Sequence, residues 1–240
     1  MILFRLPIIQ SLFTVRKNMA VYIFLGIFIL LLAILGVTYL QKKNRARTQT
    51  NLGIGEINSW SQELLSNLEW KRFEEVVCKY YELLGYRSEV TRMGADGGVD
   101  VLLYQQGAET PVVFIQCKSW SQKIGVKAVR ELYGVMAAEE IPYGVFATTS
   151  AYTQEAINWV DGKRLQLLDG SDLVSAFNQL PQEQKKYLIE FATFGDYRTP
   201  TCPSCDVKMV SRTASKGKSA GSNFWGCKHY PRCKQTFKMV

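Results

Sequence analysis

An acid, an amide and a lysine stand close together in the middle of this 240-residue chain. Asp100 opens one stretch of strand-forming residues, and Gln116 and Lys118 close the next stretch. Side chains two residues apart on a strand point to the same face, so the amide and the lysine emerge side by side. If the two strands pair as a hairpin, the acid converges on them. Metal-assisted hydrolysis of a phosphodiester needs a carboxylate to hold the ion and a cation near the nucleophile, and this set of residues supplies both.

Four cysteines near the C-terminus have the spacing of metal ligands. Cys202 and Cys205 form one knuckle, Cys227 and Cys233 form another, and 21 residues separate the two. Four thiolates suit a closed tetrahedral zinc site, which is structural because it leaves no position for a substrate. A module of about 40 residues has too little core to fold alone, so zinc would supply its folding free energy. His229 lies between two of the cysteines, but four thiolates already fill the site.

The same module carries aromatic and basic side chains of the kind that bind nucleic acid. Trp225 and Tyr230 either stack on bases or form the small core of the module, and the sequence leaves both interpretations open. Lys228 and Arg232 lie close to them in the sequence. The four side chains are the candidates for contacts with DNA, with the packing alternative open for the two rings.

The formal net charge of +8 is unevenly distributed. Residues 1–53 contain seven basic and no acidic side chains, residues 54–198 contain 14 basic and 20 acidic ones, and residues 199–240 contain eight basic and one acidic. The two ends therefore suit a polyanion, whereas the middle segment needs a local basic face to hold DNA by itself. Candidates for phosphate contacts in the middle segment are Arg87, Arg92, Lys123 and Lys127.

Residues 19–40 contain no charged side chain. A helix of this length spans a hydrocarbon core of about 30 Å, so the run predicts a transmembrane helix. No small-residue cleavage site follows it, which disfavours a signal peptide. Four basic residues follow the run and three precede it, so the positive-inside rule places the C-terminal part in the cytoplasm. A start at Met19 would strengthen that bias.

Cys78 and Cys117 lie in apolar helix-like and strand-like runs, where a buried free thiol is the simplest interpretation. Unpaired thiols favour a reducing compartment.

Helix-like and strand-like runs alternate between the anchor and the cysteines, which predicts an α/β sandwich with a mixed or partly parallel sheet. The continuous apolar run 112–117 predicts a central strand buried on both faces, and Ser171 is the expected cap of a short helix. Strands are predicted at 86–91, 99–104, 112–117, 143–148 and 165–168, and helices at 68–85, 127–139, 153–160, 171–178 and 181–191. The predicted organisation is a short segment at 1–18, the helix at 19–40, a basic linker at 41–58, the α/β domain at 59–180, a connecting helix at 181–198 and the zinc module at 199–240.

The run GADGGVDVLLYQQGAETPVVFIQCKSW, residues 94–120, resembles the core of the Mrr-type restriction endonucleases, a branch of the PD-(D/E)XK nuclease superfamily in which the second acid is commonly Gln. Four further blocks resemble the same family in the same order, and together they cover about 110 residues. These blocks are LEWKRFEEVVCKYYELLGYRSEVT, VREL, GVFATTSAYTQEAINWV and LQLLDGSDL.

The resemblance implies a restriction-endonuclease-like sandwich and assigns roles to individual residues. Asp100 would be the principal ligand of Mg²⁺, and Gln116 stands where a second acid often binds the metal. Lys118 would orient or polarise the attacking water, and Glu74 would complete the metal site through a bound water. Asp96 lies between glycine and alanine on one side and two glycines on the other, where an Asp is ordinarily a turn former.

The segment FWGCKHYPRC resembles the C-terminal zinc fingers of bacterial type I topoisomerases, which bind single-stranded DNA. We therefore expect a metal-dependent DNA endonuclease of restriction or DNA-processing type, anchored in a bacterial inner membrane with its catalytic domain in the cytoplasm. Double-stranded DNA is the expected substrate, and a homodimer is compatible with it. The alternative is a non-catalytic, membrane-anchored DNA-binding protein that uses the nuclease fold as a scaffold.

Overall fold

The computed structural model describes residues 57–91 and 98–239. The charge-free run at 19–40 lies outside the described residues, as do Arg92 and Asp96. Among the helices that are described, none combines the length and the apolar character needed to cross a membrane. Residues Asn58–Val240 belong to one compact unit.

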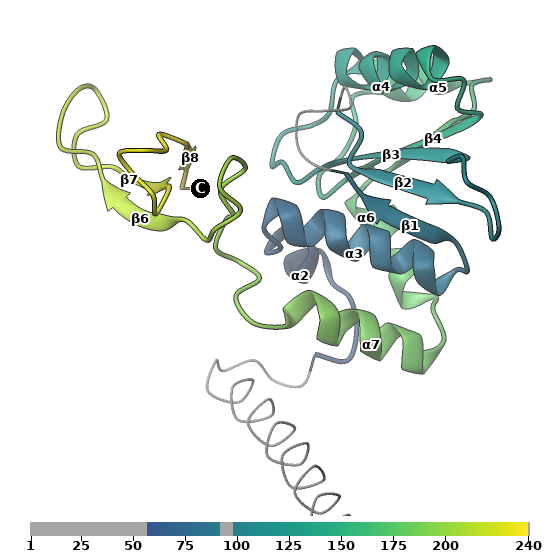
Figure 1. The fold of residues 1–240 in the computed structure, drawn as a ribbon, viewed down its shortest axis with the longest axis horizontal. Helices are drawn as coiled ribbons and strands as arrows, with labels where there is room; N and C mark the ends of the chain where they lie inside the picture. The colour runs from purple at the N-terminus through teal and green to yellow at the C-terminus, as the bar shows by residue number, and fades with distance from the viewer. Residues whose placement is uncertain (1–56, 92–97, 240) are drawn as a thin grey trace, which may run out of the picture. The chain divides into compact units, whose positions relative to one another are not determined.

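Five strands form a mixed sheet in the order β1-β2-β3-β4-β5 (Figure 1). The first three strands pair antiparallel, and β3, β4 and β5 pair parallel. The central strand β3 has four consecutive buried residues, Phe114–Cys117, as a strand covered on both faces requires. The strands are β1 (Arg87–Val90), β2 (Val101–Tyr104), β3 (Val113–Lys118), β4 (Tyr143–Thr148) and β5 (Leu165–Leu168). The predicted α/β sandwich with a mixed sheet is confirmed.

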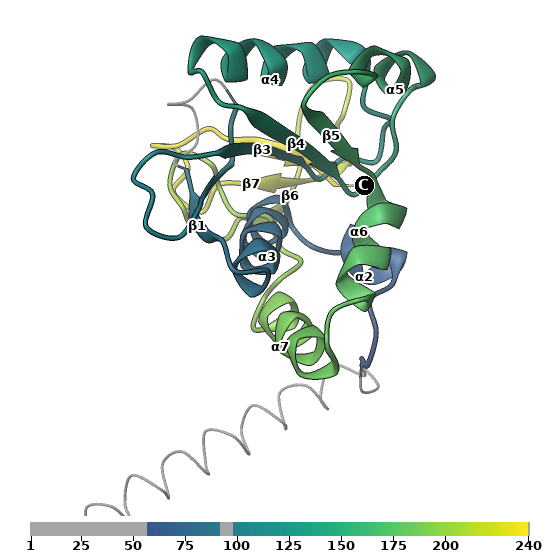
Figure 2. The same ribbon diagram turned by 90° about the vertical axis from the view of Figure 1, so that its right-hand side faces the viewer.

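Helices cover both faces of this sheet (Figures 1 and 2). Helices α4 and α5 pack together on one face, whereas α3 and α6 lie on the other and α7 packs against the outside of α3. The bounds are α2 (Gln62–Ser66), α3 (Trp70–Leu83), α4 (Val126–Ala138), α5 (Gln154–Val160), α6 (Gly170–Asn178) and α7 (Gln182–Thr193). All but α2 were predicted from the sequence.

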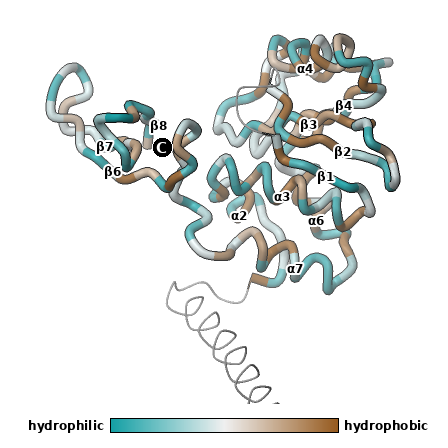
Figure 3. Tube along the Cα trace, in the orientation of Figure 1, coloured by the Kyte–Doolittle hydropathy of each residue, from teal (hydrophilic) through white to brown (hydrophobic). Residues whose placement is uncertain are grey.

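Hydrophobic burial on both faces of the sheet explains this arrangement. On one side, Phe114 and Phe146 of the sheet pack with Leu132 of α4. On the other side, the Phe177 ring of α6 lies 4.8 Å from Trp60 and 4.9 Å from Tyr80, measured between ring centroids. Figure 3 shows that β2 and β3 are mainly hydrophobic, whereas the edge strand β1 is largely hydrophilic.

The expected cap of α6 is wrong by two residues. Asp169 caps the helix, and its Oδ1 accepts hydrogen bonds from the backbone N–H groups of Ser171 at 2.8 Å and Asp172 at 2.9 Å. The Asp172 carboxylate accepts from the Asp169 N–H in return, at 3.1 Å, which completes a capping box. The helix therefore begins at Gly170, and Ser171 lies in its first turn.

The cysteine module contains a three-stranded antiparallel sheet in the order β6-β7-β8. Its strands are β6 (Val210–Thr213), β7 (Asn223–Gly226) and β8 (Thr236–Lys238). The first knuckle precedes β6, and the second lies between β7 and β8. The sheet thereby brings the two knuckles together.

Candidate nuclease site and zinc site

Asp100 lies at the start of the β2–β3 hairpin and is held by three hydrogen bonds. Its backbone N–H donates to the Ile115 carbonyl at 2.9 Å, and its own carbonyl accepts from the Thr91 N–H at 3.0 Å. Its Oδ2 accepts from the backbone N–H of Cys117 at 2.7 Å. Since β2 and β3 pair antiparallel, the condition under which the acid converges on the second strand is met. It holds the Asp100 carboxylate at the end of β3 that carries Lys118.

Gln116 is buried in β3, and its side-chain Oε1 has no hydrogen-bond partner among the described residues. Gly98 packs closely against the other side of the amide, since a Cβ atom at that glycine would lie 2.6 Å from Gln116 Nε2. Gly98 has a φ of +94°, which also favours glycine. A buried carbonyl oxygen without a partner is costly. A cation that prefers oxygen ligands would remove that cost.

Glu74 reaches the same region from α3. Burial disfavours its charged form and the Asp100 carboxylate repels it, so the pKa of Glu74 rises to about 9, although Lys118 opposes the rise. Burial also raises the pKa of Asp100, while the Cys117 N–H and Lys118 act in the opposite direction. The structure thus brings Glu74, Asp100 and Lys118 within electrostatic reach of one another. Two acids that resist ionisation together suit a divalent cation, and the partnerless Gln116 Oε1 is an oxygen donor of the kind that such an ion prefers.

Cys117 lies between Gln116 and Lys118 but belongs to the opposite side of the strand. It is buried, and the charges that act on it include Glu74 and Cys78 of α3. Cys78 is buried as well, and both thiols are free. The expectation of buried free thiols is confirmed.

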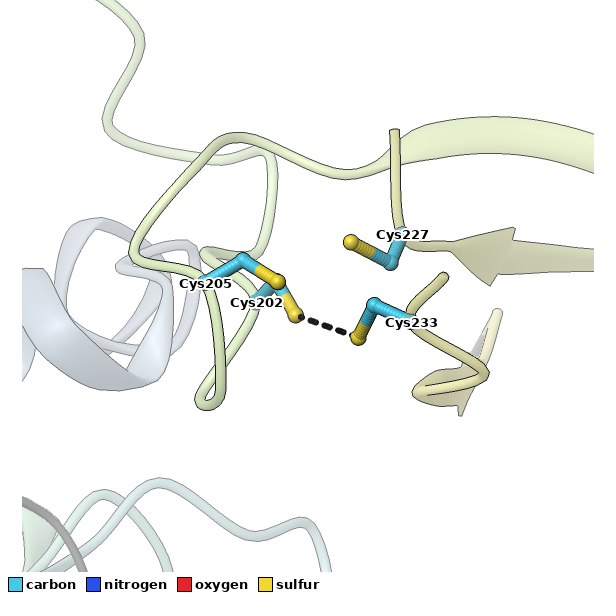
Figure 4. Close-up of side chains that lie close together, drawn as sticks. All are labelled: Cys202, Cys205, Cys227 and Cys233. Carbon is cyan, nitrogen blue, oxygen red and sulfur yellow. Dashed lines mark hydrogen bonds between the residues drawn. The ribbon is translucent and has the colours of Figure 1, made fainter. Parts of the chain in front are cut away.

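The four C-terminal cysteines converge on one point (Figure 4). Their Sγ atoms all lie within 4.8 Å of one another, and those of Cys202 and Cys233 are 3.7 Å apart. Cys202 and Cys227 are buried. His229 is exposed and does not belong to the cluster, although its backbone N–H lies 3.4 Å from Cys227 Sγ. This geometry is consistent with a structural Zn²⁺ site.

The two aromatic candidates of the module have different environments. Trp225 packs with Phe237 against the buried Cys202, Met209 and Cys227, so it is part of the core of the module. Tyr230 is 60% exposed, and the guanidinium carbon of Arg212 lies 5.4 Å from the centroid of its ring. Lys228 and Arg232, on either side of Tyr230 in the chain, are exposed.

Comparison with known proteins assigns both parts of the chain. Residues 65–177 match the model of the Mrr catalytic domain family, described as a restriction endonuclease. This segment is similar to the catalytic domains of Mrr-type restriction endonucleases. Residues 199–240 match the topoisomerase DNA binding C4 zinc finger.

Relatives of the Mrr-type domain occur in longer proteins. The type IV methyl-directed restriction enzyme EcoKMrr of Escherichia coli (strain K12) is 32% identical over 123 residues, which are 48% of this chain and 40% of that protein. The uncharacterized protein y4cE of Sinorhizobium fredii (strain NBRC 101917 / NGR234) is 31% identical over 107 residues, or 43% of this chain and 27% of that protein. The chain thus spans less than half the length of either relative.

Two solved structures show a distant likeness. The MspJI restriction endonuclease in complex with a 27-mer oligonucleotide aligns with a TM-score of 0.38 and 22% identity over 56% of this chain and 34% of that chain. The DNA modification-dependent restriction endonuclease AspBHI aligns with a TM-score of 0.40 and 24% identity over 54% and 38%.

The remaining candidates for phosphate contacts in the Mrr-type domain differ in their surroundings. Arg87 is engaged, because its Nη1 donates to Glu89 Oε1 at 2.6 Å and its guanidinium carbon lies 3.8 Å from the centroid of the Tyr104 ring. Lys123 and Lys127 are exposed, and they lie just before and at the start of α4.

Sequence reasoning missed two residues near the site. Trp120 is 56% exposed only two positions after Lys118, and no periodic pattern distinguishes such a tryptophan from a core residue. Glu69, in the helix-opening motif Leu68-Glu69-Trp70, is buried although it is an acid. A pairing between distant segments decides its burial, so the local sequence carries no signal for it.

Proposed function

We propose that the chain is a membrane-anchored, Mg²⁺-dependent endodeoxyribonuclease. One observation carries the proposal: the carboxyl groups of Glu74 and Asp100 lie within electrostatic reach of each other and of Lys118, in a segment that matches the Mrr family. The partnerless oxygen of Gln116, in the same strand as Lys118, is a further oxygen donor.

The residues of the site would have different roles in hydrolysis. Asp100 and Gln116 would hold Mg²⁺ through oxygen atoms, and Glu74 would hold it through a water. Bound Mg²⁺ supplies charge neutralisation at the phosphate and a more acidic water. Lys118 would orient that water and offset charge that develops on the phosphate oxygens. The Cys117 N–H keeps the Asp100 carboxylate in place throughout.

DNA is the proposed substrate, bound by the zinc module and the nuclease domain together. The module carries eight basic residues and one acidic residue, and a site of four thiolates and one Zn²⁺ lowers its charge from +7 to about +5. That charge still favours phosphate and makes binding sensitive to salt. Tyr230, Lys228 and Arg232 are exposed and suit single-stranded DNA. Trp120 and Lys123 would contact duplex next to the cleaved bond.

The proposed membrane anchor rests on the charge-free run at 19–40. The two buried free thiols and the cysteine cluster suit a reducing compartment, which supports a cytoplasmic C-terminal part. The full chain should sediment with membranes and require detergent for release. Protease added to spheroplasts should leave the C-terminal part intact, and its digestion from outside would exclude this orientation.

The activity is tested with the full chain in detergent and with plasmid DNA as substrate. Methylated and unmethylated plasmids should be compared, because one relative bears the name of a methyl-directed enzyme. Cleavage is expected with Mg²⁺ and not with Ca²⁺ or without a divalent cation. Conversion of circles directly to linear molecules would indicate that two subunits act together. A protein that binds every DNA tested and cuts none, with Mg²⁺ or Mn²⁺, would favour the scaffold alternative.

A further inference from the structure

Glu69 is a buried carboxylate between α3 and the first cysteine knuckle, and only 3% of its side chain is exposed. Its Oε1 accepts from the Thr201 hydroxyl at 2.9 Å and from Lys208 Nζ at 3.0 Å. Its Oε2 accepts from the backbone N–H of Thr201 at 3.1 Å and from that of Lys71 at 3.2 Å. One carboxylate therefore bonds to the helix and to the knuckle at the same time.

On the helix side, Glu69 is the N-cap of α3. Its backbone carbonyl accepts from the Phe73 N–H at 2.9 Å, and its side chain accepts from the Lys71 N–H. Asp, Asn, Ser and Thr are the usual N-caps, because a short side chain reaches the first free N–H groups. The longer Glu side chain satisfies the helix start and still reaches Thr201 and Lys208.

Two further contacts hold the joint, which is the contact between the first turn of α3 and the first knuckle. The indole Nε1 of Trp70 donates to the Thr201 carbonyl at 2.8 Å. Lys71 forms an ion pair with Asp206. Thr201 immediately precedes Cys202, and Asp206 immediately follows Cys205, so these bonds fix the knuckle on both sides of its two cysteines.

The helix that begins at this joint carries Glu74, five residues after Glu69. A helix is stiff over so short a distance, so the position of its first turn determines where the Glu74 carboxylate lies relative to Asp100. Displacements of about 1 Å at a catalytic site change rates by about 100-fold. A change in the conformation of the first knuckle would therefore shift the first turn of α3 and, with it, the Glu74 carboxylate.

We propose that Glu69 is a positioning residue that couples zinc binding at the four cysteines to the placement of Glu74. Zinc orders the knuckle, and the knuckle presents Thr201 and Lys208 to Glu69. Glu69 in turn fixes the first turn of α3. The role in cleavage rests on the proposed function, whereas the coupling between zinc and α3 does not. A zinc module that served only to hold DNA would need no such joint.

Hydrogen–deuterium exchange of the full chain tests the coupling without any substrate. Glu69→Gln, and removal of zinc with a zinc-selective chelator, should each speed exchange in the first turn of α3 at least tenfold. Thr201→Val removes one hydrogen bond and should act in the same direction, more weakly. Lys79→Met removes an ion pair with Glu82 in the second half of α3, away from the contacts with the knuckle, and it is the matched control, with little change expected in the first turn. Exchange in α4 should be unaffected by every change.

Kinetics with plasmid DNA then separate positioning from DNA binding. Glu69→Gln should lower kcat at least tenfold at saturating DNA and raise the Mg²⁺ concentration needed for half-maximal cleavage, with KM for DNA within twofold. Tyr230→Ala should instead raise KM and leave kcat unchanged. The proposal fails if zinc removal and Glu69→Gln leave exchange in α3 unchanged, or if Glu69→Gln alters KM alone. A wild-type chain that shows the coupling in exchange but never cleaves would overturn the proposed function and not the coupling.

Discussion

The Asp100 carboxylate and the Cys117 backbone N–H are joined by a hydrogen bond of 2.7 Å that crosses the β2–β3 hairpin. Cys117 lies between Gln116 and Lys118, so the bond sets the acid beside the two residues that the strand presents together. The main chain of β3 therefore positions the acid, and substitutions of the neighbouring side chains leave that bond in place. This separation makes the roles of the three side chains testable one at a time.

Asp100→Ala and Lys118→Ala should each lower Mg²⁺-dependent cleavage by about 100-fold or more, while DNA affinity changes little. The reasons differ, because the first substitution removes a metal ligand and the second removes the cation near the nucleophile. Calorimetric titration with Mg²⁺ should show lost binding in Asp100→Ala and retained binding in Lys118→Ala. Full activity in both variants would place the cleavage site elsewhere.

Gln116→Leu should stabilise the Mg²⁺-free protein and weaken Mg²⁺ binding. The wild-type oxygen is buried without a partner among the described residues, and such a group costs about 1–3 kcal/mol. Thermal unfolding without Mg²⁺ should therefore shift upward by a few degrees, at roughly 2–4 °C per kcal/mol. Gln116→Glu is the control, and it should keep cleavage because related enzymes place an acid there. A leucine variant with lower stability and unchanged Mg²⁺ affinity would contradict the assignment.

Stability without Mg²⁺ should fall as pH rises from about 5 to about 9. The pKa of Glu74 is 4.5 ordinarily and about 9 in the folded protein, so between these values the folded state holds one more proton than the unfolded state. Folding then becomes less favourable with each step up in pH. Glu74→Gln should flatten the dependence by on the order of 4 kcal/mol between pH 5.5 and 8.5, at about 1.4 kcal/mol per pH unit, as urea unfolding at these two values would show. Mg²⁺ should restore wild-type stability at the higher pH, and parallel curves for the two proteins would refute the expectation.

Cys227→Ser should abolish zinc binding and unfold the module, because the metal supplies much of its folding free energy. Zinc content measured by atomic absorption should fall, together with affinity for single-stranded DNA. Unchanged zinc and unchanged affinity in this variant would show that the four cysteines do not hold the ion.

Tyr230→Ala and Trp225→Ala should separate DNA contact from packing. Tyr230 is exposed, so its loss should weaken single-stranded DNA binding by about 1–3 kcal/mol while zinc content stays constant. Trp225 packs against the cysteine core, so its loss should lower the thermal stability of the module. Fluorescence anisotropy with a labelled oligonucleotide and thermal melts would distinguish the two effects. If Trp225→Ala weakened DNA binding and Tyr230→Ala lowered the thermal stability instead, Trp225 would be the DNA contact and Tyr230 the packing residue.

Local patterns in the sequence were sufficient for the five strands of the mixed sheet, for five of its helices and for part of each site. The two-residue period of a strand placed Gln116 and Lys118 on one face and Cys117 on the other, and the structure agrees. The spacing of the four cysteines predicted a cluster, because each knuckle is a short loop whose geometry is local. The apolar run 112–117 predicted the buried central strand for the same reason, since a strand covered on both faces needs no polar side.

Tertiary structure alone decided the relationships between distant segments. The proximity of Glu74 to Asp100 depends on how α3 packs on one face of the sheet, and no local period encodes that packing. The sequence left packing and base stacking open for both Trp225 and Tyr230, and only the fold of the module separates the partly buried ring from the exposed one. From its local sequence Glu69 would be an ordinary solvated acid, and only the contact with Thr201 in the folded protein explains its burial. Local preferences act over a few residues, whereas burial and pairing are set by which elements meet, and that is determined by the packing of the whole domain.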